Sequence, residues 1–112
     1  MAQTLSKAAW PRFLERLSRE LVGKRAEIEI ASLEIGDQIE ADWLPLFGIA
    51  YDPKNDLIEI ALEGVDHLIR NPVSLAVECD WPIVSSIEIV DREGAQQIIR
   101  LRDPLMLSAA RQ

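Results

Sequence analysis

Ala26-Glu27-Ile28-Glu29-Ile30 is the stretch that decides the fold. Apolar and acidic residues alternate over these five positions, which is the period of a β-strand with one buried and one wet face. Extended patterns return in five later segments. These are Gln38–Tyr51, Leu57–Leu62, Val73–Cys79, Val84–Asp91 and Gln96–Arg102. The sequence therefore predicts about six strands.

One segment ahead of these strands has helical periodicity instead. Its apolar residues recur at a spacing of three and four, which places them on one stripe of a helix. They are Trp10, Phe13, Leu14, Leu17 and Leu21. Pro11 suits the first helical turn and Gly23 suits the position after the last turn, so the pattern predicts a helix over 11–22.

Most connections between the predicted strands are short turns, of which Asp52-Pro-Lys-Asn-Asp56 is the clearest. Neighbouring strands should therefore pair antiparallel. We expect an α+β fold with one N-terminal helix packed on an antiparallel sheet of about six strands. The sheet is either open or curled into a small open barrel, and the sequence does not separate the two.

Several finer expectations follow from the same patterns. The alternation in the second strand turns Ile39, Ala41 and Trp43 to one side, and Trp43 is expected to pack against Trp10 between helix and sheet. The segment from Gly64 to Pro72 is less periodic and predicts a loop or a short irregular strand. Residues 1–112 form one domain, with 1–9 and 105–112 expected to be loosely held.

Composition disfavours several classes of partner. The chain of 112 residues has a formal net charge of -7 and a pI near 4.6, which repels phosphate backbones and anionic membranes. Cys79 is the single cysteine, and the N-terminus does not resemble a signal peptide. We therefore expect a cytoplasmic protein without a nucleic-acid or membrane partner.

Motifs for metal, cofactor or nucleophile chemistry are weak. The one histidine, His67, lies twelve residues from Cys79 without paired ligand spacing, and the five glycines are isolated, so no metal or cofactor is expected. Ser85, Ser86 and Cys79 lie in no nucleophile motif. Acidic residues at the wet strand positions predict a solvated face, on which Arg100 and Arg102 lie opposite some of them.

The segment around His67 holds the best acid–base candidates. Asp66 could orient the His67 imidazole, and Arg70 could hold an anionic ligand, although a structural role for His67 in a loop is favoured. No catalytic residue is assigned. The expected binding residues are Tyr51, Asp52, Asp66, His67, Arg70, Asn71 and Trp81, the last because it stands beside Pro82 in a strand break.

Three segments together resemble a known family. They are Trp10-Pro-Arg-Phe13, Leu44-Pro-Leu-Phe-Gly-Ile-Ala-Tyr-Asp52 and Asp66-His-Leu-Ile-Arg-Asn-Pro72. The chain is similar to a family of short bacterial proteins catalogued only as a domain of unknown function. The resemblance covers nearly the whole chain and implies a free-standing cytoplasmic domain without an assigned reaction or cofactor.

Two functional hypotheses remain open at this point. The first is a non-enzymatic binding or assembly module, whose partner is a protein or a second copy. It acts through a sheet edge or through a rim formed by Tyr51, Asp52, Asp66, His67, Arg70 and Asn71. The outward apolar residues Leu57, Val90 and Ile98 favour self-association. The second is a small-molecule binder or enzyme, in which Asp66 and His67 transfer a proton and Arg70 holds an anion.

Overall fold

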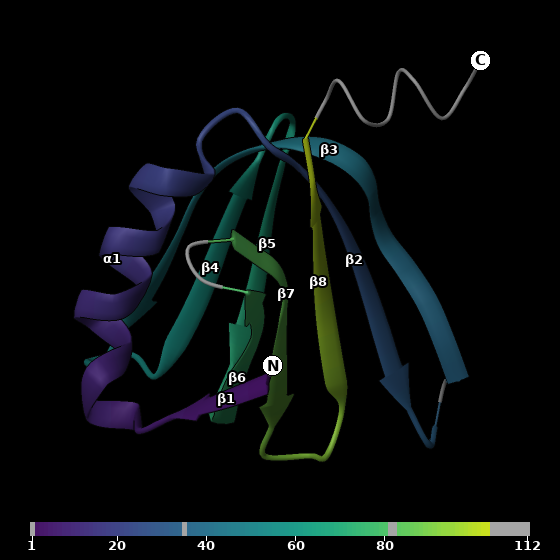
Figure 1. Cartoon of the computed structure of the whole chain (residues 1–112). Coiled ribbons are helices and arrows are strands. Elements are labelled where there is room, and N and C mark those ends of the chain that lie inside the picture. The colour runs from purple at the N-terminus through teal and green to yellow at the C-terminus, as the bar shows by residue number, and fades with distance from the viewer. Residues whose placement is uncertain (1, 35, 81–82, 104–112) are drawn as a thin grey trace.

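A computed structural model describes residues 2–34, 36–80 and 83–103 and has one α-helix and eight strands among them (Figure 1). The helix, α1, is Trp10–Leu21 and follows a 3-10 turn, η1, at Lys7–Ala9. The strands are β1 (Ala2–Leu5), β2 (Arg25–Ser32), β3 (Gly36–Asp52), β4 (Leu57–Leu62), β5 (Val65–Arg70), β6 (Pro72–Asp80), β7 (Ile83–Asp91) and β8 (Gln96–Arg102). The predicted α+β class is confirmed.

All eight strands belong to one antiparallel sheet with the order β1-β6-β7-β8-β2-β3-β4-β5. The order is linear, so β1 and β5 are its two ends and the sheet is open. The predicted bounds of Leu57–Leu62 and Gln96–Arg102 are those of β4 and β8. The other four predicted strands differ from the observed ones by one or two residues at most of their ends, with β2 extending to Ser32.

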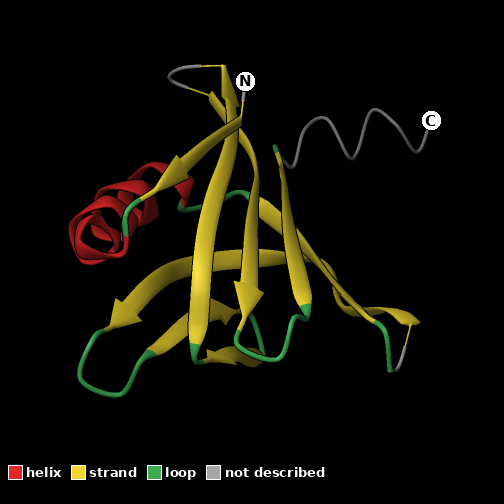
Figure 2. Cartoon of the chain, turned by 90° about the horizontal axis from the view of Figure 1, so that it is seen from below, coloured by secondary structure: helices red, strands yellow, loops and turns green. Residues whose placement is uncertain are grey.

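The long strand β3 divides the sheet into two parts. Residues 36–45 of β3 pair with β2, and residues 46–52 pair with β4. The sheet folds back on itself where β3 changes partner, so β4 and β5 lie in a separate layer from β6, β7 and β8 (Figure 2). One edge of the second half of β3 is left without a neighbouring strand.

Helix α1 covers that edge. Ser18 places its Oγ against Ile49, where it accepts a hydrogen bond from the backbone N–H at 2.7 Å and donates one to the carbonyl oxygen at 2.6 Å. Gly48 lies beside the same Oγ, which a β-carbon at this position would meet at 3.7 Å, an ordinary van der Waals distance. The serine therefore replaces a neighbouring strand at Ile49, since buried backbone groups need partners.

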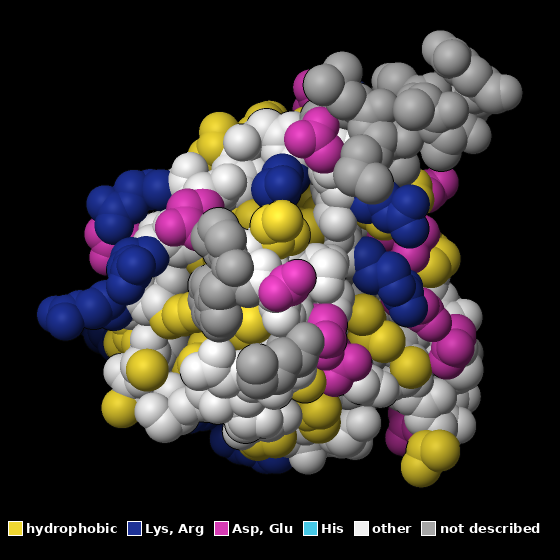
Figure 3. Space-filling view, in the orientation of Figure 1, with side chains coloured by type: hydrophobic (Ala, Val, Ile, Leu, Met, Phe, Trp, Pro, Cys, Tyr) yellow, Lys and Arg dark blue, Asp and Glu magenta, His cyan; other side chains and the backbone are white. Residues whose placement is uncertain are grey.

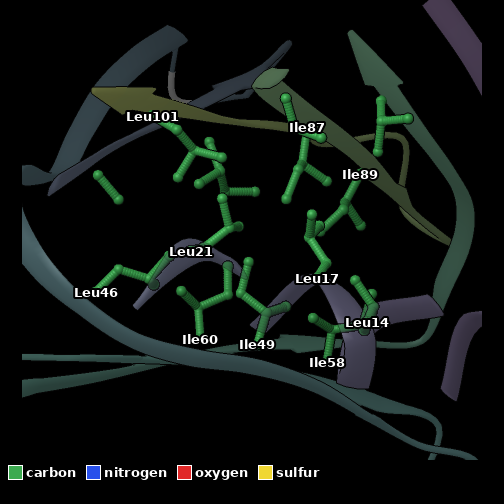
Figure 4. Packing of buried hydrophobic residues seen from close by; sticks show 14 of the residues in the cluster. Leu14, Leu17, Leu21, Leu46, Ile49, Ile58, Ile60, Ile87, Ile89 and Leu101 are labelled. Atoms are coloured by element: carbon green, nitrogen blue, oxygen red, sulfur yellow. The ribbon is translucent and has the colours of Figure 1, made fainter. Parts of the chain in front are cut away.

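The core lies between the two layers of the sheet and the helix. Figure 4 shows the helical residues Leu14, Leu17 and Leu21 between isoleucines of both layers. Ile49, Ile58 and Ile60 come from one layer, and Ile87 and Ile89 come from the other. The helix thus fills the space between two sheet layers, which is why Trp10, Leu14, Leu17 and Leu21 of its apolar stripe are buried, while Phe13 is partly buried.

Two segments are more regular than the sequence predicts. Residues 2–5, within the part expected to be loosely held, form β1 and pair with β6 from Ala2 opposite Glu78 to Leu5 opposite Leu75. Val65–Arg70, expected to be a loop or irregular strand, is a regular strand that pairs with β4 without a bulge. Residues 105–112 lie outside the described part of the chain.

The expected inward positions of Ile39 and Trp43 are wrong. Ile39 lies opposite Glu29 and is 54% exposed, because the pairing of β2 with β3 shifts register on both sides of Ile28. Trp43 has a φ of 55° and places its ring 5.0 Å from the guanidinium of Arg102 instead of against Trp10. Local alternation does not predict such register shifts.

Charged side chains of both signs intermingle on the outer face that carries β7, β8 and β2 (Figure 3). Arg100 pairs with two acids of β2, at 3.0 Å to Glu27 and 2.8 Å to Glu29. The predicted opposition of Arg100 to the outward acids is therefore confirmed. No helix in the described part of the chain is long and apolar enough to span a membrane.

Candidate functional site

The turn between β3 and β4 places several predicted binding residues at one end of the sheet. Asp52 accepts hydrogen bonds from the backbone N–H of Lys54 at 3.0 Å and from the side-chain amide of Asn55 at 2.6 Å. This arrangement is an Asx turn, at the place where the sequence predicts a short turn. Asp52 therefore stabilises the turn through both of its carboxylate oxygens.

Tyr51 contacts two residues that sequence reasoning did not select. Its hydroxyl donates to Asp56 Oδ1 at 2.7 Å, and Lys7 Nζ lies 2.9 Å from the same oxygen. Lys7 also donates to the carbonyl oxygen of Pro72 at 2.9 Å. Trp10 packs edge-on against the Tyr51 ring, with 5.1 Å between the ring centroids. Lys7 and Asp56 are 49 residues apart, so no local pattern relates them.

The groups of this cluster titrate differently from isolated side chains. Hydrogen bonds from Tyr51 and then Lys7 lower the pKa of Asp56. The hydrogen bond to Asp56 raises the pKa of Lys7, against a smaller effect of burial. Burial of the phenol, followed by its hydrogen bond to Asp56, raises the pKa of Tyr51. The carboxylate and ammonium are thus the favoured forms in the folded protein.

We predict that Asp56→Asn removes part of the acid sensitivity of folding. Because the folded-state pKa of Asp56 is lowered, its contribution is present above the unfolded pKa and is lost as the pH falls below about 4. Urea midpoints measured from pH 3 to 7 should therefore fall less steeply for this variant. Asp42→Asn, at an exposed position of β3, should keep the wild-type slope. Equal slopes for the wild type and Asp56→Asn would contradict the prediction.

The corner between β5 and β6 meets the same end of the sheet. Asn71 has a φ of 53°, donates its N–H to the carbonyl oxygen of Asp56 at 2.9 Å, and accepts at its own carbonyl oxygen from the N–H of Arg92 at 2.9 Å. Asparagine tolerates this left-handed conformation better than most residues do. The corner thereby joins the β3–β4 turn to the β7–β8 turn.

A polar pocket of about 390 Å³ opens beside this corner. Its lining residues are Leu68, Arg70, Asn71, Asp91, Arg92, Glu93 and Gln97. Asp91 is already engaged, because its Oδ1 accepts from the backbone N–H groups of Glu93 and Ala95. We call this space the Arg70–Arg92 pocket, since it presents two guanidinium groups beside the corner.

Asp66 and His67 do not form a pair. Successive side chains of a strand point to opposite faces, and accordingly Asp66 is exposed while His67 is half-buried and faces the other layer. His67 Nε2 lies 2.5 Å from Oε1 of Gln97, which is 6% exposed on β8. The histidine thus contacts an amide across the interior instead of the adjacent carboxylate.

The direction of the backbone groups in β5 follows from the Ser18 contact. Ile49 directs its N–H and carbonyl toward the helix, so Ile49 and Ile60, which lie opposite one another, are a non-hydrogen-bonded pair. Ile60 must then bond toward His67 on its other side. The N–H of Asn71, which donates to Asp56 across the same pair of strands, agrees with this alternation.

The even-numbered residues of β5 therefore direct their backbone groups away from β4. They are Asp66, Leu68 and Arg70, and all three side chains are exposed. The pairings described for β5 involve β4 alone. Together, these three residues define what we call the β5 edge, and the Arg70–Arg92 pocket lies beside it. The sequence selected Asp66 and Arg70 as binding residues, but it did not select Leu68 and did not reveal which way the backbone groups point.

Five of the predicted binding residues fall into two groups, while His67 contacts Gln97 in the interior. Tyr51, Asp52 and Asn71 hold the turns together at one end of the sheet, whereas Asp66 and Arg70 lie on the β5 edge. Trp81 lies outside the described residues. Within the part of the chain that the structure describes, no three His, Cys, Asp or Glu side chains come close enough to hold a metal ion.

The fold and this edge define a small α+β protein with an open antiparallel sheet, and comparison with known proteins places it further. The model of a family of unknown function, DUF5335, matches residues 1–110, so the chain belongs to that family. An uncharacterized protein of Aquifex aeolicus is 37% identical over 106 residues, which cover 94% of this chain and 96% of the relative. No solved structure matches. The resemblance stated from the sequence is confirmed.

Proposed function

We propose that the protein is a non-enzymatic binding module of the cytoplasm, which recognises a protein partner by adding a strand of that partner to the β5 edge. The orientation of the β5 backbone carries this proposal. Asp66, Leu68 and Arg70 offer N–H and carbonyl groups to a new strand, and their side chains are exposed. Strand addition to an open sheet edge is a recurring mode of peptide recognition.

Two further observations support a binding module over an enzyme. Asp66 and His67 lie on opposite faces of β5, so the Asp66 carboxylate does not meet the imidazole as proton transfer between them requires. His67 instead contacts Gln97 in the interior. The buried thiol of Cys79 suits a reducing compartment, which is why we place the module in the cytoplasm.

A second candidate function rests on the Arg70–Arg92 pocket. The pocket of about 390 Å³ is lined by these two arginines and also by Asp91 and Glu93. A small anionic ligand would bind through the guanidinium groups, which hold carboxylate and phosphate through paired hydrogen bonds. NMR titration with inorganic phosphate tests this candidate. Saturable shifts at Arg70 and Arg92 would favour it, and unchanged spectra would remove it.

The test of strand addition is site-specific photo-cross-linking in the cells that make the protein. A benzophenone amino acid replaces Glu59, which is exposed and lies opposite Leu68 in the register of β4 with β5. The control site is Glu88, which is exposed on β7, a strand with neighbours on both sides. We expect a protein adduct from position 59 and not from position 88.

A second variant makes this test specific for the backbone. Leu68→Pro removes one N–H from the β5 edge, so the adduct from position 59 should disappear, whereas Leu68→Ala should retain it. Mass spectrometry identifies the captured protein. Absence of an adduct at position 59, or an adduct that survives Leu68→Pro, would overturn the proposed function.

A further inference from the structure

We infer that the strand added to the β5 edge is β5 of a second copy of this chain, in a two-fold symmetric dimer centred on Leu68. The inference rests on the proposed function and names its partner. In an antiparallel pairing of two identical strands, the residue numbers that lie opposite have a constant sum. When Leu68 lies opposite Leu68 of the second copy, Asp66 lies opposite the second copy's Arg70.

The backbone allows this register. Asp66, Leu68 and Arg70 all direct their N–H and carbonyl groups to the free side, so all three positions form hydrogen-bonded pairs when the axis passes through Leu68. The ladder then uses all three residues of β5 whose backbone groups point to the free side. Beyond Arg70 the chain turns away, because Asn71 has a φ of 53° and β6 begins at Pro72.

Charge complementarity selects this register among its neighbours. With the axis at Leu68, an acid faces a base at both ends of the pairing, and opposite charges across strands stabilise a sheet. Moving the axis by one residue places Leu68 opposite Asp66 or opposite Arg70. Moving it by two residues places Asp66 opposite Asp66, or Arg70 opposite Arg70, and like charges destabilise the pairing.

The surroundings of the edge suit the same partner. Leu68 is 40% exposed, and a second Leu68 would cover it. Arg70 lines a pocket of mixed charge together with Arg92, Asp91 and Glu93, and the carboxylate of the second copy's Asp66 would approach the Arg70 guanidinium at its border. The pairing therefore buries Leu68, gives hydrogen-bond partners to the free backbone groups, and places opposite charges together. A strand of arbitrary sequence would not do all three.

Two single charge reversals test the inference. Asp66→Arg and Arg70→Asp each place two pairs of like charges opposite one another, so each variant should dimerise about ten-fold more weakly than the wild type. An equimolar mixture of the two variants should recover association, because every introduced charge then faces its opposite on the other copy. The double variant D66R/R70D should recover it as well. Sedimentation velocity over a range of concentrations measures all four samples.

Both replaced side chains are exposed, so each variant is expected to fold. Far-ultraviolet circular dichroism of each variant is the control for folding. A wild-type protein that sediments as a monomer at every concentration would overturn the inference. Single variants that associate as well as the wild type, or a mixture no stronger than its components, would overturn it too. An adduct at position 59 with a different protein, beside a monomeric wild type, would refute the dimer while leaving the proposed function in place.

Discussion

Ile69→Pro is expected to cost about 1–3 kcal/mol or more of folding free energy beyond the loss caused by Ile69→Ala. The N–H of Ile69 points toward β4, where Ile69 lies opposite Ile58, so proline removes a ladder hydrogen bond and puts its ring between the strands. A domain of this size has a total stability of about 5–15 kcal/mol, so this variant should lose a large part of its free energy of unfolding. Urea unfolding followed by circular dichroism measures the difference.

Leu68→Pro is the matched control, one residue away. Its N–H points to the free edge, so proline there should differ from Leu68→Ala by less than about 1 kcal/mol. The contrast between positions 68 and 69 tests the backbone orientation on which the proposed function depends. Equal penalties at the two positions, or a larger one at Leu68, would show that the alternation is assigned the wrong way round.

Trp10→Ala is expected to destabilise the protein by about 3–5 kcal/mol. The indole is 1% exposed, packs against the Tyr51 ring, and donates from Nε1 to the carbonyl oxygen of Leu5 at 3.1 Å. Its removal leaves a cavity at the start of α1 and takes away the contact that holds the end of β1. Chemical denaturation of this variant beside the wild type gives the loss.

Trp43→Gly provides the comparison. The sequence assigns both tryptophans to the core, whereas the structure buries Trp10 and leaves Trp43 half-buried. Trp43 holds a left-handed φ of 55°, which costs an ordinary residue about 1–2 kcal/mol and glycine almost nothing. The glycine variant loses the ring contact with Arg102 but relieves this strain. Its stability loss should be less than half of that for Trp10→Ala. Equal losses of stability for Trp43→Gly and Trp10→Ala would show that Trp43 contributes to the core as Trp10 does.

The segment from Val65 to Arg70 shows where sequence reasoning stopped. Its polar residues Asp66, His67 and Arg70 obscure the period of two, since only Ile69 is a fully buried apolar position. The strand forms because β4 offers a regular neighbour and Gly64, at a φ of 77°, permits a tight turn between them. Asp66 and Arg70 lie on the β5 edge, whereas the expected pairing of Asp66 with His67 fails because neighbouring residues of a strand point to opposite faces.

The sequence by itself determined the class of fold, because the side-chain periods of helix and strand arise from local backbone geometry. The helical stripe from Trp10 to Leu21 and the alternation after Ala26 follow from that geometry. Tertiary structure alone decided which edge stays free, which lysine meets Asp56, and which amide meets His67. Those contacts join residues 30 to 49 positions apart, so they depend on how the strands are ordered and folded over, which no local period contains.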